Sequence, residues 1–144
     1  MNQIISLEAP RIYPTFRYRD AARMADWLVE AFGFRIHASH ERDGRIVHAE
    51  LALGSSMIMI GETADDAYGD LVGAPGATGG KSTYVAIDDA DLLFARARGA
   101  GAKILQGLSD TDYGSRDFIC ADPEGNVWCF GTYWPKAHEN PAAE

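Results

Sequence analysis

The chain has 144 residues, of which 47% are hydrophobic and 24% charged, which is the composition of one ordinary globular domain. Its formal net charge of −8 argues against a nucleic-acid partner, because no basic stripe is available to displace counterions from phosphates. Two cysteines, with neither a basic-then-apolar leader nor a long apolar run, predict a cytoplasmic protein without a membrane partner.

The first half of the chain predicts a strand, a helix and three further strands. Asp20 is a suitable N-cap, and Gly33 supplies a helix stop. Between them, apolar residues recur at helical spacing: Met24, Trp27, Leu28 and Ala31. The strands expected around this helix are Arg11–Arg19, Phe34–Glu41, Ile46–Leu53 and Ser56–Ile60. Asp43-Gly44 predicts a two-residue hairpin turn.

The second half predicts the same series of elements. Asp89 caps a helix whose apolar stripe contains Ala90, Leu93, Phe94 and Ala97, and which ends at Gly99 and Gly101. The strands expected around it are Lys81–Asp88, Ile104–Leu108, Arg116–Ala121 and Asn126–Tyr133. The segment Asp122 to Asn126 predicts a hairpin turn, since it has proline early and a residue tolerant of positive φ late.

Alternation along the last strand predicts two different faces. Trp128, Phe130, Thr132 and Trp134 share one face, which we expect to pack on a helix. The other face carries Val127, Cys129, Gly131 and Tyr133, and is left for function.

The two halves align with each other, since Asp20 falls on Asp89 and, after a slip of one residue, Gly33 to Ile36 falls on Gly101 to Ile104. This repeat predicts an α+β fold with two βαβββ modules, 11–61 and 81–134, in a single domain spanning 1–144. We expect the modules to pair into a cup-shaped mixed sheet with the helices outside. The glycine-rich residues 62–80 carry two acidic clusters and Tyr68, and are predicted to form a linker or lid.

The paired modules, together with the DPEGN turn, resemble the vicinal-oxygen-chelate superfamily, which includes glyoxalase I, extradiol dioxygenases and bleomycin-resistance proteins. Three motifs are most similar to the bleomycin-resistance branch: Tyr113-Gly114, Arg116-Asp117-Phe118 and Asp122 to Asn126. In that branch a Trp, here replaced by Tyr113, lies against a planar ligand. The resemblance implies a homodimer that sequesters a cationic or aromatic small molecule, as in antibiotic resistance, and works by occupancy.

Metal-dependent members of the superfamily place ligands on the first and last strands of each module. By this resemblance the corresponding positions are Tyr13, Ser82, Cys129, and either Ile58 or Met59. A hard divalent ion needs oxygen or imidazole donors, which this set does not supply. We therefore expect no metal, no cofactor and no catalytic residue. Cys129 is interpreted as a buried structural thiol, and a pairing with Cys120 on the adjacent strand stays open.

A rival site is predicted at the Asp43-Gly44 hairpin. Folding about this turn sets His37 opposite Glu50, with His48 diagonal to them on the same face, and Ser39 and Glu41 nearby. The opposite face would pack on a helix through Ile36, Ala38, Val47, Ala49 and Leu51. The His-Glu face is either a polar ligand wall, a metal site or a solvated surface.

Two other functions therefore remain open. One is a metal-dependent lyase, dioxygenase or thiol transferase of the same superfamily that uses His48 and Glu50. The other is an interaction module without a small ligand. The stretch from Ile46 to Gly80, which contains acidic residues but no Lys or Arg, either aids solubility or attracts a cation.

Overall fold

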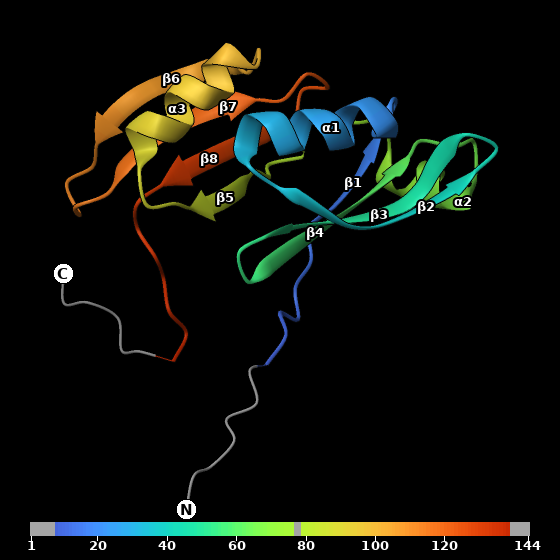
Figure 1. Ribbon diagram of the computed structural model, residues 1–144, viewed down its shortest axis with the longest axis horizontal. Helices are drawn as coiled ribbons and strands as arrows, with labels where there is room; N and C mark the ends of the chain where they lie inside the picture. Colours follow the sequence, from blue (N-terminus) through green and yellow to red (C-terminus); the bar gives the residue numbers. More distant parts are fainter. Residues whose placement is uncertain (1–7, 77–78, 139–144) are drawn as a thin grey trace, which may run out of the picture. The chain divides into compact units, whose positions relative to one another are not determined.

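The computed structural model describes residues 8–76 and 79–138. The chain separates into two compact units, Met1–Pro75 and Gly76–Glu144. Each unit is a four-stranded sheet with one long helix in the order β-α-β-β-β, so the predicted α+β class and the two βαβββ modules are confirmed (Figure 1). The cup that the two sheets were expected to form together stays a prediction.

The first unit contains β1 (Thr15–Tyr18), α1 (Ala21–Phe32), β2 (Arg35–Arg42), β3 (Arg45–Leu53) and β4 (Ser56–Glu62). The strand order is β1-β4-β3-β2, in which β1 runs parallel to β4 and the other pairs are antiparallel. β1 begins later than the sequence predicted because Pro14 has no N–H for the ladder, although its carbonyl accepts a hydrogen bond from Met59 N at 3.0 Å.

α1 begins and ends as the sequence predicted. The Asp20 carboxylate accepts a hydrogen bond from Arg23 N at 3.1 Å, and Gly33 ends the helix in the left-handed region at φ 85°. The helix buries its apolar side against the sheet, through Met24, Trp27, Leu28 and Ala31 among others. The Asp43-Gly44 turn is also confirmed, with φ positive at both residues.

The second unit contains β5 (Thr83–Ala86), α3 (Ala90–Gly99), β6 (Lys103–Asp110), β7 (Arg116–Ala121) and β8 (Val127–Gly131). The strand order β5-β8-β7-β6 repeats the topology of the first unit, with β5 parallel to β8. Asp89 caps α3 by accepting a hydrogen bond from Leu92 N at 3.1 Å. The internal repeat read from the sequence is therefore a structural repeat.

The core of the second unit lies between its sheet and α3. The ring of Phe94 on α3 meets Phe118 edge to face at 5.3 Å, and Phe118 stacks on Phe130 at 5.1 Å. Trp128 and Phe130 are fully buried, so their predicted position on the helix-facing side is confirmed. The predicted place of Trp134 on the same face is wrong, because β8 ends at Gly131. Trp134 is 49% exposed, and its Nε1 donates to the Ile87 carbonyl at 3.2 Å.

The DPEGN turn is held by its aspartate. The buried Asp122 carboxylate accepts hydrogen bonds from Glu124 N at 2.9 Å, Asn126 N at 3.1 Å and Trp128 Nε1 at 3.1 Å. Gly125 takes φ 92°, a conformation that side chains disfavour. The turn thus orients the largest core side chain of this unit.

The connection after β4 contains a helix that the sequence did not predict. β4 continues to Glu62, and α2 (Ala67–Val72) follows, capped by Asp66, which accepts a hydrogen bond from Gly69 N at 2.7 Å. α2 buries none of its residues, so it has no apolar period from which to recognise it. Residues 77–78 of the predicted linker lie outside the described residues. No helix in the described part of the chain is long and apolar enough to span a membrane.

Candidate functional site

The sheet of the second unit turns one face to α3 and the other away from it. Residues on this other face are neighbours across three strands: Tyr84 of β5 pairs with Cys129 of β8, which pairs with Ile119 of β7. One step further along, Gly131 of β8 pairs with Asp117 of β7. A phenol, a thiol and a carboxylate therefore gather here from separate parts of the sequence.

Asp117 is the buried charge of this face. Its residue is 9% exposed, and the Ser115 hydroxyl donates to its Oδ1. A Cβ on Gly131 would lie 2.6 Å from Tyr84 Oη and closer still to Asp117 Oδ1, so both oxygens rest directly on the glycine backbone. Only glycine at 131 permits this arrangement.

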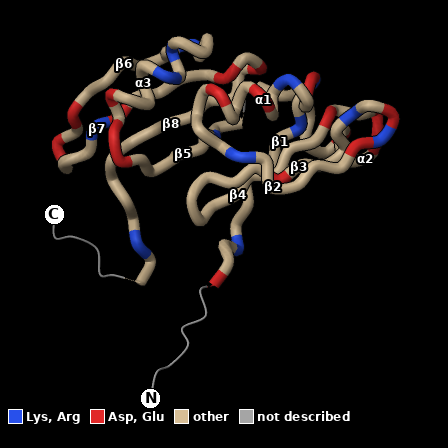
Figure 2. The backbone as a smooth tube through the Cα atoms, viewed as in Figure 1, with Lys and Arg blue, Asp and Glu red and all other residues tan. Residues whose placement is uncertain are grey.

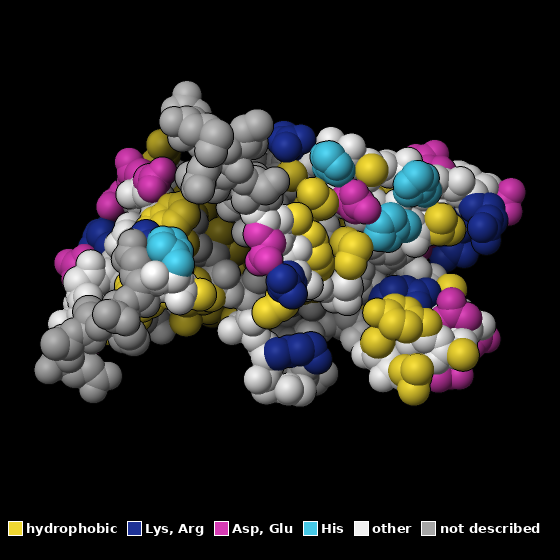
Figure 3. Space-filling model, turned by 90° about the horizontal axis from the view of Figure 1, so that it is seen from below, with side chains coloured by type: hydrophobic (Ala, Val, Ile, Leu, Met, Phe, Trp, Pro, Cys, Tyr) yellow, Lys and Arg dark blue, Asp and Glu magenta, His cyan; other side chains and the backbone are white. Residues whose placement is uncertain are grey.

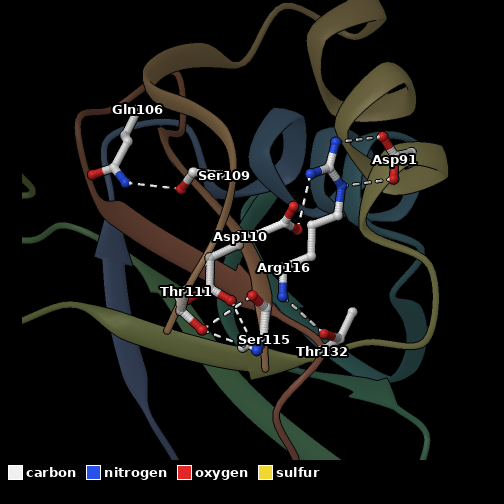
Figure 4. A network of polar contacts seen from close by, with 9 residues as sticks. Asp91, Gln106, Ser109, Asp110, Thr111, Ser115, Arg116 and Thr132 are labelled. Carbon is white, nitrogen blue, oxygen red and sulfur yellow. Dashed lines mark hydrogen bonds and ion pairs between the residues drawn. The ribbon is translucent and has the colours of Figure 1, made fainter. Parts of the chain in front are cut away.

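Ser115 links Asp117 to the chain around it. Its buried hydroxyl also accepts a hydrogen bond from Tyr133 N at 3.1 Å. Its backbone closes a tight turn, donating from N to Thr111 Oγ1 at 2.9 Å and accepting from Thr111 N at 2.8 Å (Figure 4). This turn carries Tyr113, so the same serine fixes the places of Tyr113, Asp117 and Tyr133.

Three exposed tyrosines lie on this side of the sheet, and two of them, Tyr84 and Tyr113, bring their hydroxyls close to the carboxylate. Tyr113 is 64% exposed, Tyr133 52% and Tyr84 40%, and the rings of Tyr113 and Tyr133 meet edge to face at 5.9 Å. The Tyr84 hydroxyl donates to the Tyr133 carbonyl at 2.7 Å. Burial raises the pKa of the Tyr84 phenol above its usual value, and the Asp117 charge adds to the rise. We call Tyr84, Tyr113, Tyr133 and Asp117 the tyrosine face.

Arg116 is next to Asp117 in sequence but forms its ion pairs with other carboxylates. Its guanidinium lies between Asp91 of α3 and Asp110 of β6, with N–O distances of 3.0 Å to each (Figure 4). The hydrogen bond with Arg116 holds the pKa of Asp91 below its usual value. This ion-pair network fastens α3 to the sheet and leaves Asp117 uncompensated.

Cys129 is a half-buried neutral thiol. Burial raises its pKa, and the nearby Asp117 charge adds to the rise, so the thiolate that binds soft metals is disfavoured. Cys120 pairs with Trp128 and therefore faces α3, whereas Cys129 faces the other way. The pairing of the two cysteines that the sequence left open does not form, and both are free.

The remaining positions singled out by the family resemblance do not make a metal site. Tyr13 precedes β1 and is half-buried, and Ser82 precedes β5 and is exposed. Ile58 is buried in the core, while Met59 pairs with Glu50 and faces away from α1, so Met59 is the position on the functional side. A thioether, a thiol and hydroxyls do not fit a hard divalent ion.

The His-Glu cluster of the first unit forms, but in a different register from the predicted one. A β-bulge at His37 shifts β2, so that Ala38 lies opposite Glu50 and Ser39 opposite Ala49. His40 then takes the place opposite His48, and their rings stack at 6.0 Å. The predicted pairing of His37 with Glu50 is therefore wrong by one residue, as is the placement of Ser39 on this face.

His48 and His37 nevertheless both approach the Glu50 carboxylate. His48 Nε2 lies 3.2 Å from one Glu50 oxygen, and His37 Nε2 lies 4.0 Å from the other. Figure 3 shows histidine side chains gathered around an acidic one on the side away from α1. On the helix side Ala49 and Leu51 are buried as predicted, but Ile36 and Val47 stay half-exposed. Over residues 8–76 and 79–138, no three His, Cys, Asp or Glu side chains are grouped to hold a metal ion.

Tyr68 lies on α2 and packs against Arg17 of β1. The Arg17 guanidinium lies 5.1 Å from the centre of its ring, and Arg17 Nε donates to the Glu62 carbonyl at 3.0 Å. A cavity of about 260 Å³ adjoins this contact, and Arg17, Arg19, Thr63, Gly69, Asp70 and Gly73 are among its lining residues. The structure thus fastens the start of the predicted lid to β1.

The acidic stretch is partly neutralised by arginines from other strands. Glu62 forms an ion pair with Arg45, and Asp66 lies 3.5 Å from Arg17 Nη1. Figure 2 shows basic and acidic segments side by side around α2. The negative electrostatic field of this stretch is therefore weaker than its sequence alone suggests.

Comparison with known proteins agrees with this topology. Residues 12–130 match the sequence pattern of the Glyoxalase/Bleomycin resistance protein/Dioxygenase superfamily. The chain belongs to this superfamily. An uncharacterized protein of Mycobacterium bovis, Mb0911c, is 30% identical over 125 residues, which cover 85% of this chain and 82% of that protein.

Solved structures of the superfamily share the fold. TioX from Micromonospora sp. ML1 is 32% identical, with a TM-score of 0.68 over 85% of this chain and 94% of that one. A superfamily member from Sphaerobacter thermophilus is 17% identical, with a TM-score of 0.69 over 88% of this chain and 97% of that one, which is a likeness of fold alone.

The site residues missed from the sequence are Tyr84, Ser115, Asp117 and Tyr133. The sequence placed Tyr133 on the functional face and included Asp117 in a motif, but gave neither a role. Their convergence depends on the Asp117–Gly131 register, which local patterns do not determine.

Proposed function

We propose that this superfamily member is a metal-independent binding protein of the bleomycin-resistance type, which sequesters a cationic or aromatic small molecule on the tyrosine face. The observation that carries the proposal is a buried carboxylate with the hydroxyls of two exposed tyrosines, Tyr84 and Tyr113, beside it and the ring of a third, Tyr133, against Tyr113. Large exposed rings bury apolar area on a ligand at low entropic cost and stack on planar groups. The carboxylate adds a polar contact that fixes orientation.

Two further observations support binding over chemistry. The positions at which metal-dependent relatives would place ligands hold side chains unsuited to a hard metal ion, including Met59 and a Cys129 thiol whose pKa is raised. Tyr113 stands where the bleomycin-resistance branch has a Trp, and its ring is exposed. We also propose that the protein is a cytoplasmic homodimer, as this branch implies; light scattering of the purified chain tests the dimer.

A thermal-shift screen in EDTA tests the proposed function. The panel contains cationic glycopeptides, planar intercalators and aromatic metabolites. A ligand at about 100 times its dissociation constant should add about 2.7 kcal/mol to the unfolding free energy. Tyr113→Ala should weaken that ligand tenfold or more, whereas Leu92→Ala, which removes an exposed apolar side chain on α3, should not. A chain that no panel member stabilises would favour an interaction module instead.

A second candidate is a metal-dependent lyase, dioxygenase or thiol transferase of the superfamily, acting through His48 and Glu50. The observation that favours it is the approach of two imidazoles to one carboxylate, at 3.2 and 4.0 Å. Metal analysis of the tag-free protein separates the two functions. Stoichiometric bound Zn, Ni, Mn or Fe that is lost in His48→Ala would contradict the binding function and support the metal-dependent enzyme.

A further inference from the structure

One oxygen of the buried Asp117 carboxylate is poorly satisfied. Oδ1 accepts the Ser115 hydroxyl, but the only partner of Oδ2 among the described residues is the Tyr113 hydroxyl at 3.5 Å. That distance is at the outer limit of a hydrogen bond. Since an ionised carboxylate loses its hydration on burial, it needs stronger donors or an opposite charge.

The chain itself supplies no such charge. Within the described residues Asp117 takes part in no ion pair, and the adjacent Arg116 is held by Asp91 and Asp110. The donor that does reach Oδ2 belongs to Tyr113, the most exposed of the three tyrosines, so an incoming group can displace it with little loss of packing. The poorly satisfied oxygen therefore lies beneath an exposed side chain.

The rings around this oxygen suit a cation as well. The faces of aromatic rings carry negative potential, so a cation positioned over one is attracted to it. Tyr84, Tyr113 and Tyr133 present such rings next to a negative charge, which is the combination that binds organic cations. A neutral aromatic ligand would stack on the rings but would not supply an opposite charge to Asp117.

We propose that Asp117 is the specificity-determining residue of the tyrosine face, and that the ligand carries an amidinium, guanidinium or ammonium group which pairs with Asp117 Oδ2. The group takes the place of the Tyr113 hydroxyl, while an attached apolar portion lies against the tyrosine rings. Planar cations with two N–H donors fit best, because they pair with a carboxylate through two parallel bonds. This inference rests on the proposed function and narrows its ligand class.

Benzamidine and benzamide are the probes, since they have nearly the same shape and only benzamidine is charged at neutral pH. Both are titrated into the isotope-labelled full chain at constant ionic strength, and backbone amide shifts give the dissociation constants. We expect benzamidine to bind at least tenfold more tightly than benzamide and to shift the amides of Gly131 and Tyr133. In Asp117→Asn this preference should fall to about one.

Asp26→Asn is the matched control, because it removes the same charge from an exposed position on α1. It should leave the preference unchanged; an equal fall in both variants would mean that only net charge matters and would overturn the inference. The preference for benzamidine over benzamide is measured first on the unmodified chain. The absence of this preference there overturns the inference even if Asp117→Asn fails to fold.

Equal affinity for the two probes, with shifts at Gly131 and Tyr133, would overturn the role of Asp117 but leave the binding function standing. If neither probe binds, the cation inference is wrong, whereas the proposed function is decided separately by the ligand panel.

Discussion

Replacing Trp128 with alanine should lower the unfolding free energy by about 3–5 kcal/mol. The side chain is fully buried, and a buried Trp removes roughly 150–250 Å² from water, which at about 25 cal/mol per Å² is about 4–6 kcal/mol as an upper bound. The change also removes the hydrogen bond from Trp128 Nε1 to Asp122 at 3.1 Å. Trp128→Phe, which keeps most of the ring area and loses this donor, should cost about 1–3 kcal/mol.

Urea unfolding followed by far-ultraviolet circular dichroism measures these values without depending on tryptophan fluorescence. Tyr113→Ala is the comparison from the other side of the sheet: its ring is mostly exposed, so the cost should stay within about 1 kcal/mol while ligand affinity falls. The opposite result, an unfolded Tyr113→Ala and a stable Trp128→Ala with weakened binding, would refute the assignment of the two faces.

Three other predictions concern the same unit. Asp122→Ala should cost about 2–4 kcal/mol in urea unfolding because four donors of the turn and core lose their acceptor; a loss under about 0.5 kcal/mol would contradict its role. Cys129→Ser should change stability and ligand affinity by less than about 1 kcal/mol, and a loss of binding by orders of magnitude would make the thiol functional. Burial raises the pKa of the Cys120 thiol to about 12, so the folded state keeps a proton that the unfolded chain loses. Stability should therefore fall by up to about 1.4 kcal/mol per pH unit from about pH 9 toward about pH 12, and an undiminished slope in Cys120→Ala would exclude this cause.

The elements that the sequence predicted well are those defined by neighbours in the chain. Asp20 and Asp89 cap helices through backbone N–H groups three residues away, and the DPEGN turn closes on its own aspartate. Such contacts depend on short-range geometry that the residue types largely determine. The βαβββ repeat followed from these local signals.

Two of the wrong or missing predictions involve partners distant in sequence. Two irregularities, at His37 and between His40 and Glu41, shift Ala38 to His40 by one residue, which alternation alone does not reveal. The burial of Asp117 requires Gly131 opposite it and the Tyr84 hydroxyl from a third strand. The sequence did not predict α2, because a six-residue helix without buried residues has no periodic apolar pattern.

Amide mapping of the EDTA-treated chain locates the binding site. The panel member with the largest thermal shift is titrated into the isotope-labelled protein, and the shifted amides are assigned. We predict shifts at Tyr133 of the tyrosine face, at Gly114 in the turn that carries Tyr113, and at Gly131 opposite Asp117, with little change at His48 and Glu50. Shifts confined to His48, Glu50 and their neighbours would contradict the account, because the ligand would then occupy the His-Glu cluster of the first unit.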